Sequence, residues 1–477
     1  MKLLVIGLDG MDRRLVDHFD MPFLQGLLKR LAVLPVKEDL WSRGWTKMLS
    51  GAPGTVTGAF YEQPALDGTP RFTQSFGSKN FPRDLDRRPL WMELDARGKR
   101  SAWLNLPTMM PAPAVNGVVL GGAGGGFSPE CRIPVQACHP PELQAMMIEE
   151  RMIWETRFNV SGIRSTDLFF DKCTEAIWRR VRIYVDMVKR YGPCDMGFFV
   201  QKEPVVLANI FMYTIEQLMS RGKASSALHY LLQQFYSALD DTLRYTVDML
   251  APEQVMVVSD HGMAPFKRMV NFNVILEDIG VLQHLDPPPA ARGIVQKVKG
   301  RMQQAIREAA GVHPVPHLPK VRRVDHARSE AFAHYYVPGV FLNDERFGGR
   351  SLDGEARNQM ISSIADRFNA HPVAKEVGLV ARPFRSEHAG SPKEALLPEL
   401  WVDHPEDCFP EQVGAAVQPN PYYRTWTDLH GLTRDIASGK KSSAALCAVD
   451  PAFLGDVDPV GQFDLTVVHP LVLNHFS

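Results

Sequence analysis

The chain has 477 residues, of which 45% are hydrophobic, and its 53 Lys and Arg residues nearly balance its 54 Asp and Glu residues. This length and composition are typical of one large globular domain with insertions, or of two to three domains. The balanced charge gives no support for a protein that coats nucleic acid or binds a membrane surface.

Cysteine spacing and the lengths of apolar runs bear on the cellular compartment. The six cysteines are widely scattered and none forms a C-x-x-C pair, so neither a disulfide framework nor a cysteine zinc site is indicated. A reducing cytoplasm is therefore the expected compartment. The apolar run before Asp9 is shorter than the core of a signal peptide. No run reaches the roughly 18 apolar residues of a membrane span.

Short apolar runs alternate with amphipathic stretches along the chain. This alternation predicts βαβ units and a mostly parallel sheet with helices on its faces. Long amphipathic helices are expected at residues 165–189 and 224–250. The expected strands are Leu3–Gly7, Ser101–Pro107, Gly117–Gly122, Met196–Gln201, Val255–Asp260 and Leu397–Asp403.

One segment, residues 270–395, interrupts this alternation and is predicted to form an inserted cap subdomain. It contains an expected helix with an apolar stripe from Ile294 to Ile306 and a basic opposite face. A basic face suits a cap over an anionic substrate, although a solvated helix face is the commoner explanation. Residues 1–269 and 396–477 are then expected to form one α/β core.

The expected strand that begins at Val255 ends with two polar side chains, Asp260 and His261. In open α/β sheets, ligands bind at the carboxyl ends of the strands. An oxygen donor and a nitrogen donor side by side at that edge suggest a divalent metal. The alternative is that Asp260 caps the next helix and that His261 is bonded to the backbone.

Further motifs follow in order along nearly the whole chain. They are "LLVIGLDG" (Leu3–Gly10), "GWTKMLSGAPGTVTG" (Gly44–Gly58), "NLPTMMPAPAVNG" (Asn105–Gly117), "SDHGM" (Ser259–Met263), Asn273, "GVFLN" (Gly339–Asn343), Pro398–Val402 and "LHGLTRDIASGKKSSAALCAVDPAF" (Leu429–Phe453). In their order and spacing they resemble the alkaline phosphatase superfamily, specifically its type I phosphodiesterase and nucleotide pyrophosphatase branch.

The resemblance implies an α/β fold of the alkaline-phosphatase-like kind, a three-layer sandwich with a mostly parallel central sheet and an inserted cap subdomain. It also implies a reaction at phosphorus, or more rarely sulfur, on a site with two divalent metals. One metal would be bound by Asp9, Asp260 and His261, which leave an open coordination position. Asp9 fits because a carboxylate that ends a buried strand needs a cation or strong donors. Its alternative is a loop cap bonded to the next two amides.

The chain departs from the family at the second metal. Glu203 and Pro204 match the family's Glu-Pro, but Val205 replaces a metal-binding Asp and Asn209 replaces a His. A valine cannot coordinate a cation, and an amide oxygen is a poor substitute for imidazole on zinc. His430 is the one ligand left, and its alternative role is to donate to a substrate anion or a leaving group. We therefore expect one ion, Zn²⁺, Mn²⁺ or Fe²⁺, unless Glu203 is recruited to a second.

The nucleophile of the family is displaced as well. Its position falls on Trp41, which has no nucleophilic atom. Ser42, one residue further on, is the first candidate, and Thr46 in the same segment is the second. The alternative for Ser42, of equal weight, is that it caps the amino end of the next helix.

These features predict a metal-dependent hydrolase or transferase that acts on a phosphodiester, a phosphate or a related anionic ester. Ser42 would attack phosphorus, and Thr46 and His430 are the further catalytic candidates. The alternative function is a repurposed fold that binds an anionic ligand or performs a non-hydrolytic one-metal step in a biosynthetic pathway. The expected partner is a small anionic substrate, such as a nucleotide or a phosphate ester, with no nucleic acid and no membrane.

Overall fold

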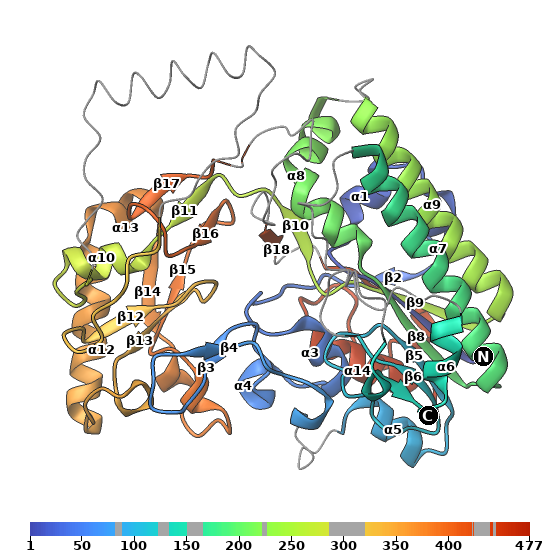
Figure 1. Ribbon diagram of the computed structural model, residues 1–477, viewed down its shortest axis with the longest axis horizontal. Helices are drawn as coiled ribbons and strands as arrows, with labels where there is room; N and C mark the ends of the chain where they lie inside the picture. Colours follow the sequence, from blue (N-terminus) through green and yellow to red (C-terminus); the bar gives the residue numbers. More distant parts are fainter. Residues whose placement is uncertain are drawn as a thin grey trace.

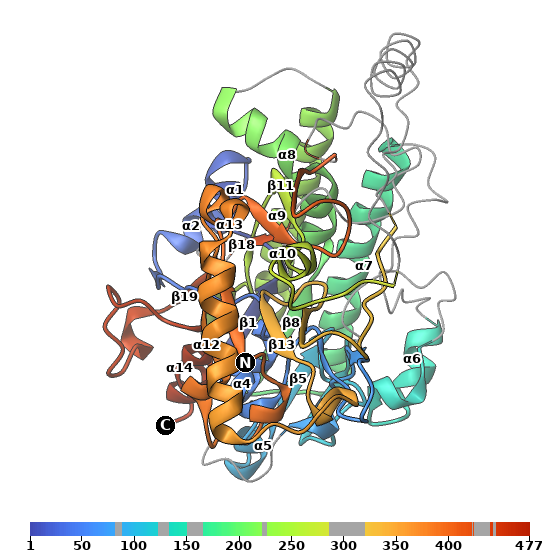
Figure 2. The ribbon, with the colours of Figure 1, turned by 90° about the vertical axis from the view of Figure 1, so that its left-hand side faces the viewer.

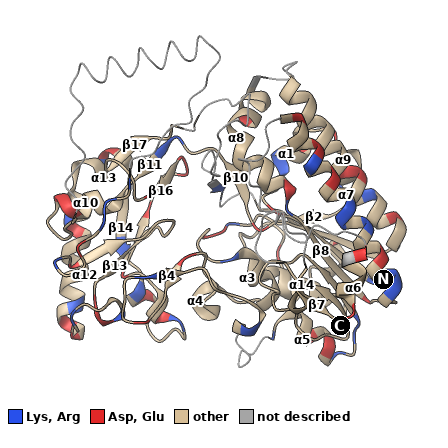
Figure 3. Cartoon of the chain, in the orientation of Figure 1, with Lys and Arg blue, Asp and Glu red and all other residues tan. Residues whose placement is uncertain are grey.

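The computed structural model describes residues 1–81, 88–122, 133–149, 166–221, 227–285, 320–421, 423, 439–441 and 445–477. Two parts lie side by side in Figure 1, a larger part with an eight-stranded sheet and a smaller part with a four-stranded and a three-stranded sheet. Lys and Arg are interspersed with Asp and Glu over both parts (Figure 3). Among the described helices, none is long and apolar enough to cross a membrane.

The sheet of the larger part has, in spatial order, the strands β2 (Ala32–Val33), β19 (Cys447–Val449), β9 (Gln254–Val258), β1 (Leu3–Leu8), β8 (Met196–Gln201), β5 (Ser101–Leu104), β6 (Gly117–Leu120) and β7 (Cys138–His139). The five strands from β9 to β6 are parallel, whereas β19 and β7 are antiparallel to their neighbours. β1 and β8 are apolar runs buried along their whole length, as is typical of a parallel sheet.

Helices cover both faces of this sheet. One face carries α1 (Arg13–His18), α2 (Pro22–Leu28), α6 (Leu143–Glu149), α7 (Thr166–Tyr191), α8 (Glu203–Arg221) and α9 (Ala227–Leu250), and the other α3 (Gly44–Ser50), α5 (Leu90–Ala96) and α14 (Val468–Asn474). Leu4 and Ile6 of β1 pack into the first core, and Leu3 and Val5 pack into the second. This alternation follows from the two-residue period of a strand. The predicted three-layer sandwich is confirmed.

The smaller part is built on an antiparallel sheet with the order β12 (Ala331–Ala333), β13 (Gly339–Leu342), β15 (Leu400–Asp403) and β14 (Val380–Pro383). The helices α10 (Phe272–Asp278), α12 (Gly354–Ala370) and α13 (Pro372–Val377) belong to this part, and Figure 2 shows α12 upright beside it. A three-stranded sheet contains β16 (Cys408–Pro410), β11 (Arg268–Val270) and β17 (Val417–Pro419). Trp41 and Phe60 also pack into the apolar core of this part.

The strand β15 shows a difference from the expected topology. The stretch Leu397–Asp403 was expected in the alternating sheet, but β15 pairs with β13 and β14 of the smaller part. It also lies beyond residue 395, the expected end of the cap segment. The strand of the larger sheet that comes last in the sequence is β19, not β15. The division of the chain at residues 270 and 395 stays a prediction.

Several short elements complete the fold. They are α4 (Gly54–Thr57), the pair β3 (Gln63–Pro64) and β4 (Phe72–Thr73), and the pair β10 (Gly262–Ala264) and β18 (Gly439–Lys441). The helices expected at 165–189 and 224–250 are confirmed as α7 and α9. The expected basic helix between Ile294 and Ile306 lies outside the described residues.

Candidate functional site

Two neighbouring strands of the larger sheet carry the three predicted metal ligands. β1 and β9 are parallel, and Gly7 is paired with Val258. Two residues further along come Asp9 and Asp260, so this register places both at the carboxyl edge of the sheet. His261 follows directly. The ligand atoms of Asp9, Asp260 and His261 all lie within 4.8 Å of one another, and all three residues are buried.

The imidazole of His261 presents one nitrogen to both carboxylates. Its Nε2 is 3.6 Å from Asp9 Oδ1 and 3.4 Å from Asp260 Oδ2. Its Nδ1 is 2.9 Å from the carbonyl oxygen of Gly262. A proton on Nδ1 donates to that carbonyl and leaves the Nε2 lone pair facing the carboxylates. Metal-binding histidines are commonly oriented by such a bond, so the backbone contact of His261 is compatible with metal binding.

The carboxylate of Asp260 supplies a test of whether a metal fits. Its Oδ1 is buried and has no hydrogen-bond partner among the described residues. A buried carboxylate oxygen without a donor is costly unless a cation meets it. After His261 the chain forms β10, so Asp260 does not cap a helix. Two carboxylates and one imidazole are ligands that a divalent ion accepts, and these residues therefore fit one.

Asp9 is also free of the capping role that was its alternative. The amide of Met11 donates to the carbonyl of Leu8 at 3.2 Å, and neither this amide nor that of Gly10 is hydrogen-bonded to the Asp9 carboxylate. Burial raises the pKa of Asp9 to about 7, and the charge of Asp260 acts in the same direction.

Burial pushes the other two ligands toward their neutral forms as well. It raises the pKa of Asp260, although the charge of Lys440 opposes the shift. It lowers the pKa of His261 to about 3, and Lys440 adds to that shift. The imidazole is thus neutral near pH 7, which is the form that binds a metal. A bound cation would offset the cost of burying the two carboxylates.

Val205, which stands in the place of a metal-binding Asp, packs against the loop that carries Asp9. Gly10 in this loop has a φ of +70°, and a Cβ built on it would lie 2.8 Å from the Cβ of Val205. An apolar side chain therefore lies at the position that the resemblance assigns to a carboxylate, and that assignment stays a prediction. The contact also makes glycine a requirement at position 10, because the left-handed backbone disfavours a side chain and the neighbour leaves no room for one.

We expect Gly10→Ala to lower the free energy of unfolding by about 1–3 kcal/mol, because a side chain at this φ is strained and meets Val205. Divalent-metal affinity should fall as well, since the loop that holds Asp9 must shift. Gly26→Ala in α2 is the matched control: a Cβ there meets nothing within 4 Å. It should stabilise the protein by up to about 1 kcal/mol. Urea denaturation measures both changes, and a Gly10→Ala protein as stable as the wild type would contradict the clash.

Both carboxylate oxygens of Glu203 are taken by an ion pair. Arg180 donates from Nη2 to Oε1 at 2.8 Å and from Nη1 to Oε2. Its Nη1 also donates to Gln201 Oε1 at 2.7 Å, and both charged groups are buried. Breaking such a buried pair costs roughly 3–5 kcal/mol, which holds Glu203 away from a role as a metal ligand. His430 lies outside the described residues, and its two expected roles stay predictions.

Trp41 and Ser42 are neighbours with different partners. The indole Nε1 of Trp41 donates to the carbonyl of Glu62 at 2.8 Å, and its ring stacks on Phe60 with centroids 3.9 Å apart. The hydroxyl of Ser42 donates to Asp39 Oδ2 at 2.8 Å, and its amide donates to Oδ1 at 2.7 Å. Trp41, at the position that the resemblance assigns to the nucleophile, is thus a buried aromatic ring, and the Ser42 hydroxyl next to it in the chain is bonded to the Asp39 carboxylate.

The two candidate nucleophiles differ in their surroundings. α3 has Arg43 as its N-cap and no side-chain cap, so the capping alternative for Ser42 is wrong. Thr46 is fully buried in α3, with its hydroxyl 3.1 Å from that of Thr108. Ser42 lines a cavity, and Thr46 is not among the residues that line it.

Asp39, the partner of Ser42, is itself held by a buried lysine. Lys47 Nζ lies 3.0 Å from Asp39 Oδ2, 2.9 Å from Glu38 Oε2 and 2.6 Å from Asp464 Oδ2. Burial alone would raise the pKa of Asp39, but Lys47 and the hydrogen bonds from Ser42 outweigh it and hold that pKa below its usual value. A carboxylate with a lowered pKa is a weak base, so Asp39 is suited to orienting the hydroxyl rather than to removing its proton.

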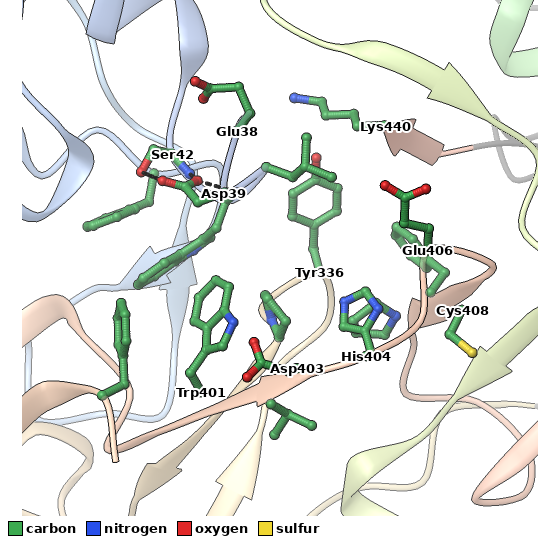
Figure 4. Close-up of a pocket in the computed structure, with 18 of the residues that line it drawn as sticks. Glu38, Asp39, Ser42, Tyr336, Trp401, Asp403, His404, Glu406, Cys408 and Lys440 are labelled. Atoms are coloured by element: carbon green, nitrogen blue, oxygen red, sulfur yellow. Dashed lines mark hydrogen bonds between the residues drawn. The ribbon is translucent and has the colours of Figure 1, made fainter. Parts of the chain in front are cut away.

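A cavity of about 470 Å³ lies between the larger and the smaller part (Figure 4). Ser42 and Asp39 line one side of it, and Tyr336 and Trp401 project from the smaller part. Lys440 lies at the upper margin of the view. The aromatic side chains along its wall are those of Trp41, Phe60, Tyr336, Phe384, Trp401 and Phe409.

Lys440 is a site residue that sequence reasoning missed. It lies in β18, opposite Met263 of β10, and its Nζ is 3.2 Å from the centroid of the Tyr61 ring. Burial lowers the pKa of Lys440 to about 8, although the charges of Asp260 and Asp9 oppose the shift. The charge of Lys440 therefore acts on two of the proposed metal ligands, and its side chain also lines the cavity. A "GKK" stretch has no spacing that would have marked it.

Two solved structures share this fold. A phosphonoacetate hydrolase from Sinorhizobium meliloti, in complex with phosphonoformate, matches with a TM-score of 0.52 and 13% identity over 99% of this chain and 96% of its own. Murine ectonucleotide pyrophosphatase/phosphodiesterase 5, inactive and in complex with AMP, matches with a TM-score of 0.50 and 12% identity over 100% of this chain and 94% of its own. The fold is thus that of the alkaline-phosphatase-like proteins, as predicted.

The family follows from the sequence itself. The profile of the type I phosphodiesterase / nucleotide pyrophosphatase family matches residues 3–318, and the chain belongs to this family. A comparison with curated proteins gave no match. The prediction of a phosphoric-ester hydrolase or phosphotransferase-like enzyme is confirmed at the level of the family.

Proposed function

We propose that the protein hydrolyses a small phosphate ester or phosphodiester and that it uses one divalent ion, bound by Asp9, Asp260 and His261. The strongest support is the convergence of these three ligand atoms around an Asp260 oxygen that has no donor among the described residues. Within the described part of the chain, no second group of this kind is found.

The donor set accepts Zn²⁺, Mn²⁺ or Fe²⁺, and such an ion supplies Lewis-acid stabilisation of the charge on phosphorus. The chain's own residues would position the reaction. Ser42 would be the attacking group, because Asp39 fixes its hydroxyl at the cavity wall. His430 would donate to the leaving group, the role that the sequence leaves open to it.

The cavity supports a substrate that combines an anionic group with a planar or apolar part. Its aromatic wall includes Trp41, stacked on Phe60, and Phe384, whose ring centroid is 5.0 Å from that of Trp401. Aromatic side chains of this kind stack well on nucleobases. The two similar structures bind AMP and phosphonoformate, which are both small anions. A nucleotide or another small phosphate ester is therefore the proposed substrate class.

An alternative function keeps the metal and gives up hydrolysis. The fold would then bind an anionic ligand or perform a non-hydrolytic one-metal step in a biosynthetic pathway. Two features favour it. Trp41, which the resemblance assigns to the nucleophile position, is stacked on Phe60, and Val205, which it assigns to a metal-ligand position, packs against Gly10.

Metal analysis and ester assays on the full chain separate the two functions. The proposed function predicts one Zn, Mn or Fe ion per chain and turnover of bis(p-nitrophenyl) phosphate or p-nitrophenyl phosphate with added Mn²⁺ or Zn²⁺. One bound ion without turnover of these esters or of a sulfate ester would support the alternative. A chain that binds no divalent ion would rule out both.

A further inference from the structure

The side chain of Lys440 lies between the metal ligands and the cavity. Its strand β18 is paired with β10, which begins directly after His261. The ammonium lies over the Tyr61 ring and lines the cavity, and its charge acts on both Asp9 and Asp260. An anion that enters from the cavity and approaches the metal ligands would therefore pass this ammonium.

Two cations close to Ser42 in the chain, Arg43 and Lys47, already have partners. Lys47 is surrounded by three carboxylates. Arg43 donates to the carbonyls of Phe60 and Gln74 at 2.9 and 2.6 Å. Lys440 differs from Lys47, because among the described residues its ammonium has no carboxylate within 4 Å. Its ammonium contacts the Tyr61 ring, whereas Arg43 contacts carbonyl oxygens.

Charge balance explains why a further cation is useful at this site. A divalent ion held by Asp9 and Asp260 would be neutralised by their two charges, and an imidazole that binds a metal is uncharged. A phosphate ester would add at least one negative charge to a buried site, where an uncompensated charge is costly. In the family, a second ion supplies the missing positive charge. Here Val205 stands in place of one of its ligands, and Glu203 is committed to Arg180.

We propose that Lys440 binds the phosphoryl oxygens of the substrate and supplies the positive charge that a second metal ion supplies in two-metal members of the family. The inference rests on the proposed function and adds a substrate-binding residue to it. A lysine ammonium offers three donors in a compact charge, which suits the oxygens of a phosphoryl group.

Binding of inorganic phosphate to the metal-loaded full chain tests this role. Lys440→Met removes the charge at similar length and should raise the phosphate Kd by roughly tenfold or more, because a charge-assisted hydrogen bond is lost. Lys440→Arg should retain most of the affinity. Lys441→Met is the matched control, since Lys441 is the next residue in β18 and points to the opposite face of the strand.

Isothermal titration calorimetry gives the phosphate Kd, and elemental analysis gives the metal content of each variant. The expected result is a wild-type metal content in all four proteins, with weakened phosphate binding in Lys440→Met alone. Equal phosphate affinity in the metal-loaded wild type and Lys440→Met would overturn this inference and leave the proposed function standing. So would a metal-loaded wild type that binds no phosphate. A wild type that takes up no metal would overturn the proposed function, and this inference with it.

Discussion

An Asp260→Asn variant should lose its divalent ion and about a thousandfold of its ester turnover, since the charge stabilisation by a metal is worth several kcal/mol. The substitution preserves the size of the side chain but replaces a charged ligand by a neutral amide, which is a poor metal ligand. Elemental analysis and the turnover of bis(p-nitrophenyl) phosphate measure the two losses.

The control for this variant is its stability without metal. Burial raises the pKa of Asp260, which shows that its charged form is unfavourable in the metal-free protein. The neutral amide avoids that cost, so metal-free Asp260→Asn should have a Tm at least as high as that of the metal-free wild type. An Asp260→Asn protein with a full metal content would contradict the assignment of this residue as a ligand.

A Ser42→Ala variant should keep its metal and lose at least about a hundredfold of its ester turnover, because covalent catalysis needs the hydroxyl. The change leaves Asp39 with its bonds to Lys47 and to the amide of residue 42. The cost to folding should therefore be about 1 kcal/mol. Steady-state kinetics with p-nitrophenyl esters, beside metal analysis, measure the effect.

Thr46→Val is the companion variant that separates the two candidate nucleophiles. The hydroxyl of Thr46 is buried against that of Thr108. Its removal should cost about 1 kcal/mol of stability and leave turnover close to that of the wild type. Loss of turnover in Thr46→Val alone would transfer the role of nucleophile to Thr46. Unchanged turnover in both variants would assign the attack to water.

The parts of the site that depend on two parallel strands in register could be predicted from the sequence. The apolar runs at Leu3–Gly7 and Val255–Val258 predicted buried parallel strands, and each run is followed by the acid that its strand presents at the carboxyl edge of the sheet. These features are local, since they need only a strand period and one adjacent polar residue.

The parts that could not be predicted depend on contacts between distant segments. Nothing in "LPELWVD" tells whether a strand joins the larger or the smaller sheet, because an apolar run fits either. The bond between Ser42 and Asp39 requires the turn before α3. Lys440 reaches the site because β18 pairs with β10 across more than 170 residues of sequence.

The central place of β1, between β8 and β9, has a consequence for biosynthesis. At the usual rate of roughly 5–20 residues per second, the ribosome makes Asp9 about 10–50 seconds before Asp260. Through that interval β1 lacks β9 on one side, and it also lacks β8 on the other side until residues Met196–Gln201 have been made. The metal-binding cluster is thus completed only after more than half of the polypeptide has emerged. Metal uptake is therefore a late stage of maturation. A scarcity of ions cannot delay the folding stages that precede the synthesis of Asp260 and His261.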